Sequence, residues 1–263
     1  MLRPRVIPCL LMQNGGLVKT VGFGKPKYVG DPINAVRIFN EKAVDEIFVV
    51  DIDATVLAKE PDYQLLEKLA VECRMPLCYG GGVRTVEQAE RLISMGIEKV
   101  ALSSAAIADP TLVARMANVV GGQSVVTVLD VRRDKGGAPV VWTHNGQRRT
   151  GFSATEAAKL MADSGAGEIV VNSIDNDGAM QGYDLPLIDD VVAAVSVPVT
   201  ALGGAGSLAH IKQLIERFGI IGAAAGSLFV FKGVYRAVLI NYPSRAEKDA
   251  LMATVASLPG SPS

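Results

Sequence analysis

The sequence predicts an α/β protein of the (β/α)₈ barrel class, and three observations lead to this prediction. First, eight short apolar runs, rich in β-branched residues, alternate with longer amphipathic segments along the 263 residues; eight strand–helix units in about 250 residues is the typical size of such a barrel. Second, the runs are continuously apolar, which is typical of parallel strands covered on both faces. Third, residues 79–106 and 202–229 share one order of strand, glycine turn, helix, strand and small-residue turn, as expected for two similar half-barrels.

The expected barrel strands are the eight apolar runs, at residues 5–12, 46–51, 76–82, 99–104, 124–131, 168–175, 198–206 and 220–227. The clearest helical patterns between them cover residues 31–43, 62–73, 86–95, 153–164 and 207–218. Three of these patterns carry helix start signals, at Asp31-Pro32, at Thr85 with Gln88, and at Ser153 with Glu156. An open doubly wound sheet is the alternative, but the Gly-x-Gly-x-x-Gly turn after its first strand is absent from this sequence.

No linker divides the chain, so residues 1–263 are expected to form a single barrel domain. Asn14-Gly15-Gly16 after the first strand predicts a flexible loop that carries Lys19. Residues 132–150 predict a β-hairpin inserted after the fifth strand, and residues 244–263 a weakly patterned C-terminal tail that frays.

Composition and charge exclude several classes of function. The net charge is −1 and no basic run stands out, so nucleic acid has no evident footprint. No stretch approaches the roughly 20 apolar residues that span a bilayer, and no signal peptide is visible. Cys9, Cys73 and Cys78 are too few and too irregularly spaced for a disulfide framework or a zinc cage. These features predict a cytoplasmic protein with free thiols, no bound metal and no cofactor.

Two matched glycine turns predict phosphate binding at the upper rim of the barrel. Glycines let backbone N–H groups approach an anion, and the N-terminus of a following helix adds its dipole. One turn combines Gly81-Gly82 with Ser103-Ser104, and the other combines Gly203-Gly204 with Gly226-Ser227. The simpler alternative is that the glycines only close tight turns. Two such turns at the same rim favour a doubly phosphorylated ligand.

Carboxylates at strand ends are the candidates for general acid–base chemistry; they are Asp51, Asp53, Asp130, Asp175 and Asp177. Asp130 directly follows an apolar strand and is the best single candidate. Asp53 and Asp177 could equally hold loop amides as Asx turns. Of the two histidines, His144 in the hairpin and His210 in a helix are interpreted as structural or surface residues.

Four charged residues begin strand runs, at Arg5, Glu46, Lys99 and Glu168. Charges at the start of a strand usually face water at the lower rim. Two cations and two anions could instead form a salt-bridged ring across the barrel mouth, and spacing alone does not choose between these alternatives.

Several motifs together carry a resemblance to one family. The segments "IPCLL", "NGGLVK", "FVVDIDAT", "YGGGVRTVEQA", "VVTVLDV", "GAGEIVVNSIDNDGAMQGYD" and "ALGGAG" resemble the cyclase subunit of imidazole glycerol phosphate synthase, to about residue 240. The resemblance implies that a glutaminase subunit docks on the bottom of the barrel. Ammonia would pass a gate of four charged residues, cross the barrel core and meet a bis-phosphorylated ribulosyl substrate, which two aspartates cleave and cyclise.

The resemblance implies a role for each matching residue. The gate maps to Arg5, Glu46, Lys99 and Glu168. Catalytic roles map to Asp130, to the active-site carboxylate Asp51 and to Lys19, which matches a lysine on a mobile loop. Substrate and phosphate binding map to Gly82, Ser103, Ser104, Asp175, Asp177, Gly204, Gly226 and Ser227.

One position departs from the family pattern, because Leu11 stands where the second catalytic aspartate is expected. General acid–base catalysis contributes about 10²–10⁴-fold, and leucine cannot transfer a proton. The wording around Leu11 resembles sugar-amidation paralogues from surface polysaccharide pathways, in which the barrel feeds ammonia to a separate ATP-dependent amidotransferase. We prefer that function over a genuine cyclase of histidine biosynthesis. A silent module that only activates the glutaminase and a phosphosugar isomerase remain as further alternatives.

Overall fold

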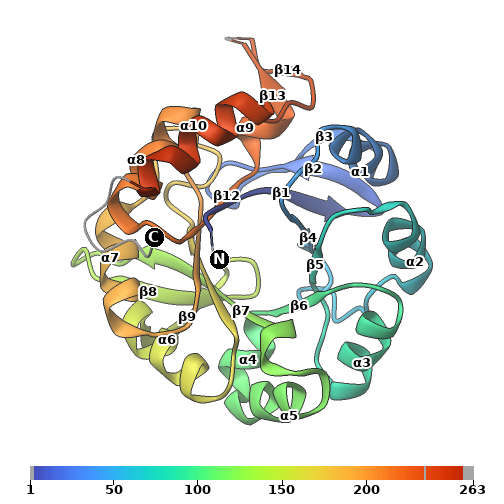
Figure 1. Cartoon of the computed structure of the whole chain (residues 1–263). Helices are drawn as coiled ribbons and strands as arrows, with labels where there is room; N and C mark the ends of the chain where they lie inside the picture. Colours follow the sequence, from blue (N-terminus) through green and yellow to red (C-terminus); the bar gives the residue numbers. More distant parts are fainter. Residues whose placement is uncertain (1–2, 234, 257–263) are drawn as a thin grey trace.

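The structure, a computed structural model, describes residues 3–233 and 235–256 and forms a closed barrel (Figure 1). Eight parallel strands make its wall: β1 (Arg5–Gln13), β4 (Ile47–Asp51), β5 (Leu77–Gly80), β6 (Lys99–Leu102), β7 (Val125–Arg133), β10 (Glu168–Ser173), β11 (Val199–Leu202) and β12 (Gly222–Ala225). Pairing of β7 with β10 and of β12 with β1 closes the ring. The predicted (β/α)₈ barrel is therefore confirmed.

Helices surround the strands as an outer ring (Figure 1). They are α1 (Pro32–Glu41), α2 (Tyr63–Glu72), α3 (Val86–Ser94), α4 (Ser104–Ala108), α5 (Pro110–Val120), α6 (Ala154–Asp163), α7 (Leu185–Ala194), α8 (Leu208–Phe218), α9 (Ser227–Val230) and α10 (Arg245–Ala256), with a 3₁₀ turn at Gly122–Ser124. The expected start signals are formed: Asp31 accepts the Asn34 amide, and both capping boxes have their reciprocal hydrogen bonds. These bonds satisfy amides that a helix start would otherwise leave unpaired.

The segment after the first strand is not the flexible loop that the sequence predicted. β1 turns at Asn14-Gly15, both with positive φ, and continues as the antiparallel strands β2 (Gly16–Lys19) and β3 (Lys27–Gly30). Leu17 and Val18 pair with the end of β1 and are buried. Their burial stabilises strand pairing, so Lys19 sits on a strand rather than on a mobile loop.

The second interruption is larger than the predicted hairpin over 132–150. β7 extends to Arg133 and pairs with β8 (Pro139–Thr143), which pairs with β9 (Arg148–Ser153). The turn between β8 and β9 spans residues 144–147, and its residues His144, Asn145 and Gly146 all have positive φ. The result is an antiparallel extension of three strands whose last residue, Ser153, also caps α6.

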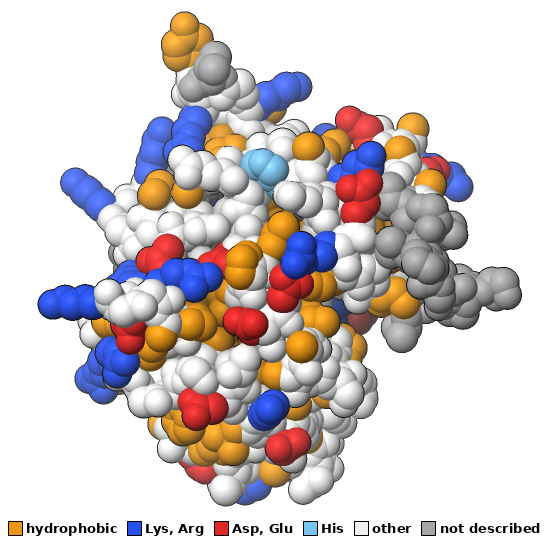
Figure 2. Space-filling view, turned by 90° about the vertical axis from the view of Figure 1, so that its left-hand side faces the viewer, with side chains coloured by type: hydrophobic (Ala, Val, Ile, Leu, Met, Phe, Trp, Pro, Cys, Tyr) orange, Lys and Arg blue, Asp and Glu red, His pale blue; other side chains and the backbone are white. Residues whose placement is uncertain are grey.

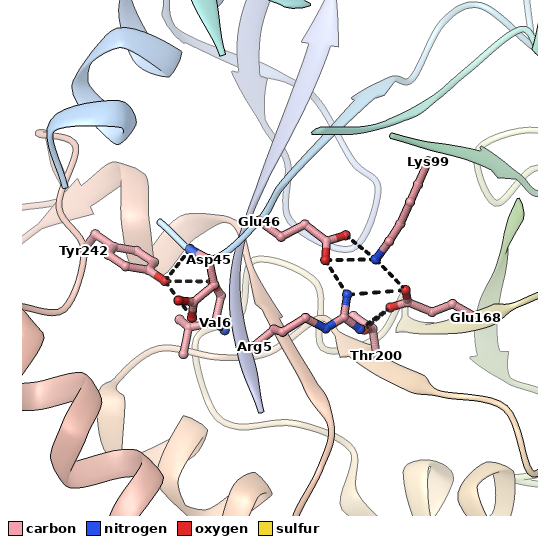
Figure 3. A network of polar contacts seen from close by, with 8 residues as sticks. All are labelled: Arg5, Val6, Asp45, Glu46, Lys99, Glu168, Thr200 and Tyr242. Atoms are coloured by element: carbon pink, nitrogen blue, oxygen red, sulfur yellow. Dashed lines mark hydrogen bonds and ion pairs between the residues drawn. The ribbon is translucent and has the colours of Figure 1, made fainter. Parts of the chain in front are cut away.

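The described part of the C-terminal tail does not fray as predicted. After the short hairpin of β13 (Phe231–Lys232) and β14 (Ala237–Val238), which projects from the barrel (Figures 1 and 2), the chain forms α10. Lys248 Nζ donates to the Ala43 carbonyl at 2.9 Å and to Asp45 Oδ1 at 3.0 Å. Tyr242 donates its hydroxyl to the Val6 carbonyl at 2.9 Å (Figure 3). These bonds fix α10 to the barrel; residues 257–263 of the predicted tail lie outside the described residues.

Two apolar clusters stabilise the barrel. The larger one fills the space between strands and helices, and the smaller one fills the interior, with Ile7, Cys9, Phe48, Cys78, Ala101, Val126, Val170, Leu202 and Ala224. Acidic and basic side chains are interspersed on the outer face that Figure 2 presents. Within the described residues, no helix combines the length and apolar character needed to cross a membrane.

Candidate functional site

A closed ring of charges crosses the barrel at the start of its strands (Figure 3). Lys99 Nζ lies 2.9 Å from Glu46 Oε1 and 2.9 Å from Glu168 Oε2. Arg5 Nη2 lies 2.7 Å from Glu168 Oε1, and Arg5 Nη1 contacts the Glu46 carboxylate. Each cation therefore bridges both anions. Of the two alternatives that spacing left open, the structure has the salt-bridged ring.

Mutual attraction outweighs burial in this ring. Burial alone disfavours a carboxylate, yet Arg5 and Lys99 hold the pKa of Glu168 below its usual range. Burial likewise works against the Lys99 ammonium, but Glu168 and Glu46 raise its pKa. Both pKa shifts favour the charged forms, the Glu168 carboxylate and the Lys99 ammonium. The ion pairs of the ring therefore stay ionised across the lower mouth.

Thr200 and Gly222 complete this layer, and sequence reasoning did not single out either of them. Thr200 donates its hydroxyl to Glu168 Oε1 at 2.6 Å. Gly222 pairs with both Arg5 and Thr200 in the sheet, and a Cβ at Gly222 would lie 1.8 Å from Thr200 Oγ1. The one available signal was a polar threonine within the apolar run that begins at Pro198.

Gly222→Ala is expected to lower the free energy of unfolding by about 2 kcal/mol, because the added methyl group overpacks the layer and displaces the Thr200 side chain. Urea denaturation measures this loss. Gly151→Ala is the matched control, because Gly151 has no atom within 4 Å of the added Cβ. Equal stability of the two variants would show that the barrel floor adapts without cost.

A small cavity lies inside the barrel directly beyond the ring. Its walls combine ring side chains with apolar ones and consist of Ile7, Glu46, Phe48, Cys78, Val126, Glu168, Val170 and Thr200. Phe48 also lines the larger pocket at the other end of the strands. Phe48 thus contacts both the space behind the charged ring and the upper pocket, within the apolar cluster that fills the interior.

The upper pocket collects most of the predicted site residues at the strand ends. Its walls include Leu11, Lys19, Asp51, Gly82, Ser103, Ser104, Asp130, Asp177, Gly226 and Ser227. Gly204 and Asp175 do not line it. The pocket therefore has several carboxylates and one lysine above an apolar floor, where Leu11, Val50 and Val128 each pack against the interior cluster.

Asp130 is the carboxylate that this pocket perturbs most clearly. Its oxygens accept from Asn172 Nδ2 at 2.8 Å and from Ser103 Oγ at 3.3 Å. Burial raises the pKa of Asp130 to about 6, although the two donors work in the opposite direction. A carboxyl group with such a pKa can exchange a proton near neutral pH. Asn172 was not singled out from sequence, where it reads as one more residue of a buried strand.

Asp51, the expected active-site carboxylate, lies in the pocket wall and also forms an Asx turn of the kind that the sequence left open for Asp53. Asp51 Oδ1 accepts the backbone amides of Asp53 at 3.0 Å and Ala54 at 3.1 Å, so Asp51 itself forms the Asx turn. It still lines the pocket, and burial raises its pKa. Asp53 instead accepts from Gln13 Nε2 at 3.0 Å. Which carboxylate of a strand-end pair turns back to the loop depends on loop geometry that the sequence does not specify.

Asp175 and Asp177 lie on different sides of their loop. Asp177 lines the pocket, accepts the Thr20 hydroxyl at 2.9 Å and has a pKa raised by burial. Asp175 is exposed and accepts the Arg133 amide at 2.9 Å. Asp175 is not among the residues that line the pocket; its carboxylate holds the start of the β7–β8 extension through Arg133, and its role in binding a ligand stays a prediction.

The glycine turns have the backbone geometry that excludes other residues. Gly82 has φ +74° and Gly204 φ +105°, and a Cβ would lie 2.6 Å from the Lys59 carbonyl and 2.0 Å from the Gly182 carbonyl respectively. Beside the first turn, Ser104 Oγ accepts the His144 amide at 2.9 Å and keeps its own proton free to donate. His210 is structural, because its Nδ1 accepts the Gly206 amide at 3.1 Å.

Lys19 lies in the pocket wall, on β2, and is 6% exposed. Its Nζ donates to the Cys9 carbonyl at 2.6 Å. Burial lowers the pKa of Lys19 and raises that of the neighbouring Cys9 thiol to about 12. Within the described residues, no group of three or more His, Cys, Asp or Glu side chains could hold a metal ion.

The chain has clear similarity to known proteins. Residues 5–236 match the family described as histidine biosynthesis protein. The chain is 54% identical over 252 residues to a Leptospira borgpetersenii protein named "Putative imidazole glycerol phosphate synthase subunit HisF", covering 95% of this chain and 99% of that one. It is 55% identical over 249 residues to the Vibrio vulnificus "Putative imidazole glycerol phosphate synthase subunit hisF3" (94% and 96%). It is 42% identical over 230 residues to the Streptomyces coelicolor "Imidazole glycerol phosphate synthase subunit HisF" (88% and 91%).

Proposed function

Because the chain belongs to the histidine biosynthesis protein family, as a HisF-like subunit of the imidazole glycerol phosphate synthase type, we propose that it conducts ammonia from a glutaminase subunit. The ammonia serves the amidation of a sugar in surface polysaccharide biosynthesis. The observation that carries this proposal is a combination: the charged ring is complete at one end of the barrel, while Leu11 stands at the other end.

The charged ring supports an ammonia gate facing the glutaminase. Four ionised side chains satisfy one another across the lower mouth, so bulk ions meet a closed layer of fixed charges. Opening the ring for neutral ammonia requires a small shift of one flexible side chain, and Lys99, which carries a long unbranched stem, is suited to that shift. The glutaminase docks against this face.

The interior supports a dry route from the gate to the upper pocket. Beyond the ring, Ile7, Val126 and Val170 line the small cavity, and Phe48 lines both this cavity and the upper pocket. Apolar walls favour neutral ammonia over the ammonium ion, because a charged species loses its hydration there. The route therefore delivers ammonia in its nucleophilic form.

The pocket end supports delivery to a separate enzyme rather than cyclisation. Leu11 lies on the pocket floor and packs against the apolar interior cluster, and a carboxylate pair acting as a unit loses most of its effect when one member is missing. Asp130 keeps a raised pKa but has no partner at position 11. The acceptor is an ATP-dependent sugar amidotransferase that takes ammonia at this end.

Complementation tests the proposal. A histidine auxotroph that lacks its cyclase subunit should not grow when it expresses this chain together with its glutaminase. With purified protein, ammonia and the ribulosyl substrate, Leu11→Asp should raise the cyclase rate about 10²-fold by restoring the second proton-transfer group. Leu11→Asn is the matched control, because asparagine has the same shape as aspartate but cannot act as a general acid or base. Growth of the auxotroph on the unaltered chain would refute the proposal.

A genuine cyclase of histidine biosynthesis is the second candidate, and one observation favours it. Asp51 and Asp130 both line the pocket together with the glycine turn at Gly82. Under that function Asp51 shares the proton transfers with Asp130, and Leu11→Asp changes the rate little.

A further inference from the structure

We propose that Lys19 is a neutral amine nucleophile that forms an imine with a small phosphorylated aldehyde or ketone in the upper pocket. The inference that the amine is neutral depends only on the contacts of Lys19. The phosphate on the carbonyl compound rests on the proposed function, in which the glycine turns of this pocket bind phosphate.

The hydrogen bonds of Lys19 fit an amine better than an ammonium ion. An ammonium group has three N–H donors and needs acceptors for them when it is buried. The Lys19 Nζ has one acceptor, the Cys9 carbonyl at 2.6 Å. Among residues 3–233 and 235–256, no carboxylate lies within ion-pairing distance of it. A neutral amine uses one N–H for this bond and keeps its lone pair for a ligand.

Lys99 shows what a charged lysine looks like inside the same barrel. Its Nζ contacts three carboxylate oxygens, at 2.9 Å, 3.0 Å and 2.9 Å. Both lysines lose water around the amino group, but only Lys99 forms direct ion pairs in exchange; the charge of Asp177 favours the Lys19 ammonium without forming an ion pair with it, and burial outweighs it. The pKa directions agree with the contacts, because burial lowers that of Lys19 while Glu168 and Glu46 raise that of Lys99.

The position of the amine is fixed and has room for a ligand. Lys19 ends β2, and β2 pairs on one side with β1 and on the other with β3. A Cβ at Gly226 would lie 2.5 Å from the Lys19 Nζ, so glycine at this position leaves the space that the amine occupies. Gly226 and Ser227 line the same pocket. A ligand bound beside Gly226 therefore lies next to Nζ.

The chemistry needs no reagent beyond the ligand. The Nζ lone pair attacks the carbonyl carbon, and the resulting carbinolamine loses water, which carries the carbonyl oxygen and both amine hydrogens. The product is a C=N bond between Nζ and the former carbonyl carbon. Desolvated lysines are activated for this reaction, because the free amine rather than the ammonium ion attacks.

Borohydride trapping of the full-length chain tests the proposal. The protein is mixed with glycolaldehyde phosphate or with unphosphorylated glycolaldehyde near pH 7, reduced, digested and analysed by mass spectrometry. Lys25 and Lys27 are exposed internal controls, and Lys27 is the direct cross-strand partner of Lys19. We expect Lys19 to be labelled at least ten times faster than either control by the phosphorylated aldehyde. Inorganic phosphate should slow that labelling.

The outcomes separate the two parts of the inference. If both aldehydes label Lys19 no faster than Lys27, Lys19 is not a neutral amine nucleophile and the proposal is refuted. Fast labelling by both aldehydes, without protection by inorganic phosphate, supports the imine and overturns the phosphate preference taken from the proposed function. Lys19→Met should remove the fast site and leave the labelling of Lys25 and Lys27 unchanged. A fast site that survives this substitution assigns the reaction to another residue and overturns the proposal.

Discussion

Glu168→Gln is expected to lower the free energy of unfolding by about 3 kcal/mol, at the lower end of the loss for a broken buried ion pair. The substitution keeps the shape of the side chain and removes one of the two anions that Arg5 and Lys99 share. Two cations then face Glu46 alone inside the barrel mouth. Arg5 retains partial exposure (24% of its side chain), and this access to water moderates the loss. Chemical denaturation at neutral pH measures the change.

An exposed ion pair provides the control for this experiment. Lys212 and Glu216 lie on one face of α8 with Nζ and Oε1 3.5 Å apart and about half their side chains exposed. Glu216→Gln should cost less than about 0.5 kcal/mol. The double variant Arg5→Met with Glu168→Leu removes one cation together with one anion. Lys99 and Glu46 then remain as a matched ion pair, so much of the lost stability should return. If Glu168→Gln is as mild as Glu216→Gln, the four charges do not act as one ring.

Asp130→Asn is expected to stabilise the protein above pH 6 by about 2 kcal/mol, while removing any proton transfer at this position. Folding raises the pKa of this carboxyl from its ordinary value of 3.8 to about 6, and each unit corresponds to about 1.4 kcal/mol; water in the pocket reduces the full effect. Asparagine removes the buried charge and keeps one oxygen acceptor for Asn172, while its amide NH2 can donate to the Ser103 hydroxyl, which also accepts.

The sign of the pH dependence follows from proton binding. Between about pH 4 and 6 the folded protein holds the Asp130 proton more tightly than the unfolded chain does. Stability contributed by this residue therefore falls as pH rises through that interval and stays low above it. The difference in unfolding free energy between Asp130→Asn and the unaltered protein should grow from pH 4.5 to pH 7. A constant or shrinking difference would contradict a raised pKa for Asp130.

Local sequence patterns were sufficient for most of the barrel. Continuous apolar runs identified the eight strands, and capping signals at Thr85 and Ser153 identified helix starts, because both signals depend on neighbours within a few residues. The same patterns misjudged two segments. β2 and α10 look weak in isolation, and each is stabilised by distant partners: Leu17 and Val18 by the end of β1, and Lys248 by Asp45.

For the site, the sequence determined which residues reach each end of the barrel, and the tertiary structure decided what they do there. Parallel strands share their ends, so Arg5 and Glu168 at strand starts necessarily lie at the same mouth, and Leu11 and Asp130 lie at the other. Whether the charges pair depends on contacts between residues 41 to 163 positions apart, which only closure of the barrel creates. Closure also leaves Lys19 with a single backbone acceptor, because burial and the number of available acceptors are properties of the packed chain.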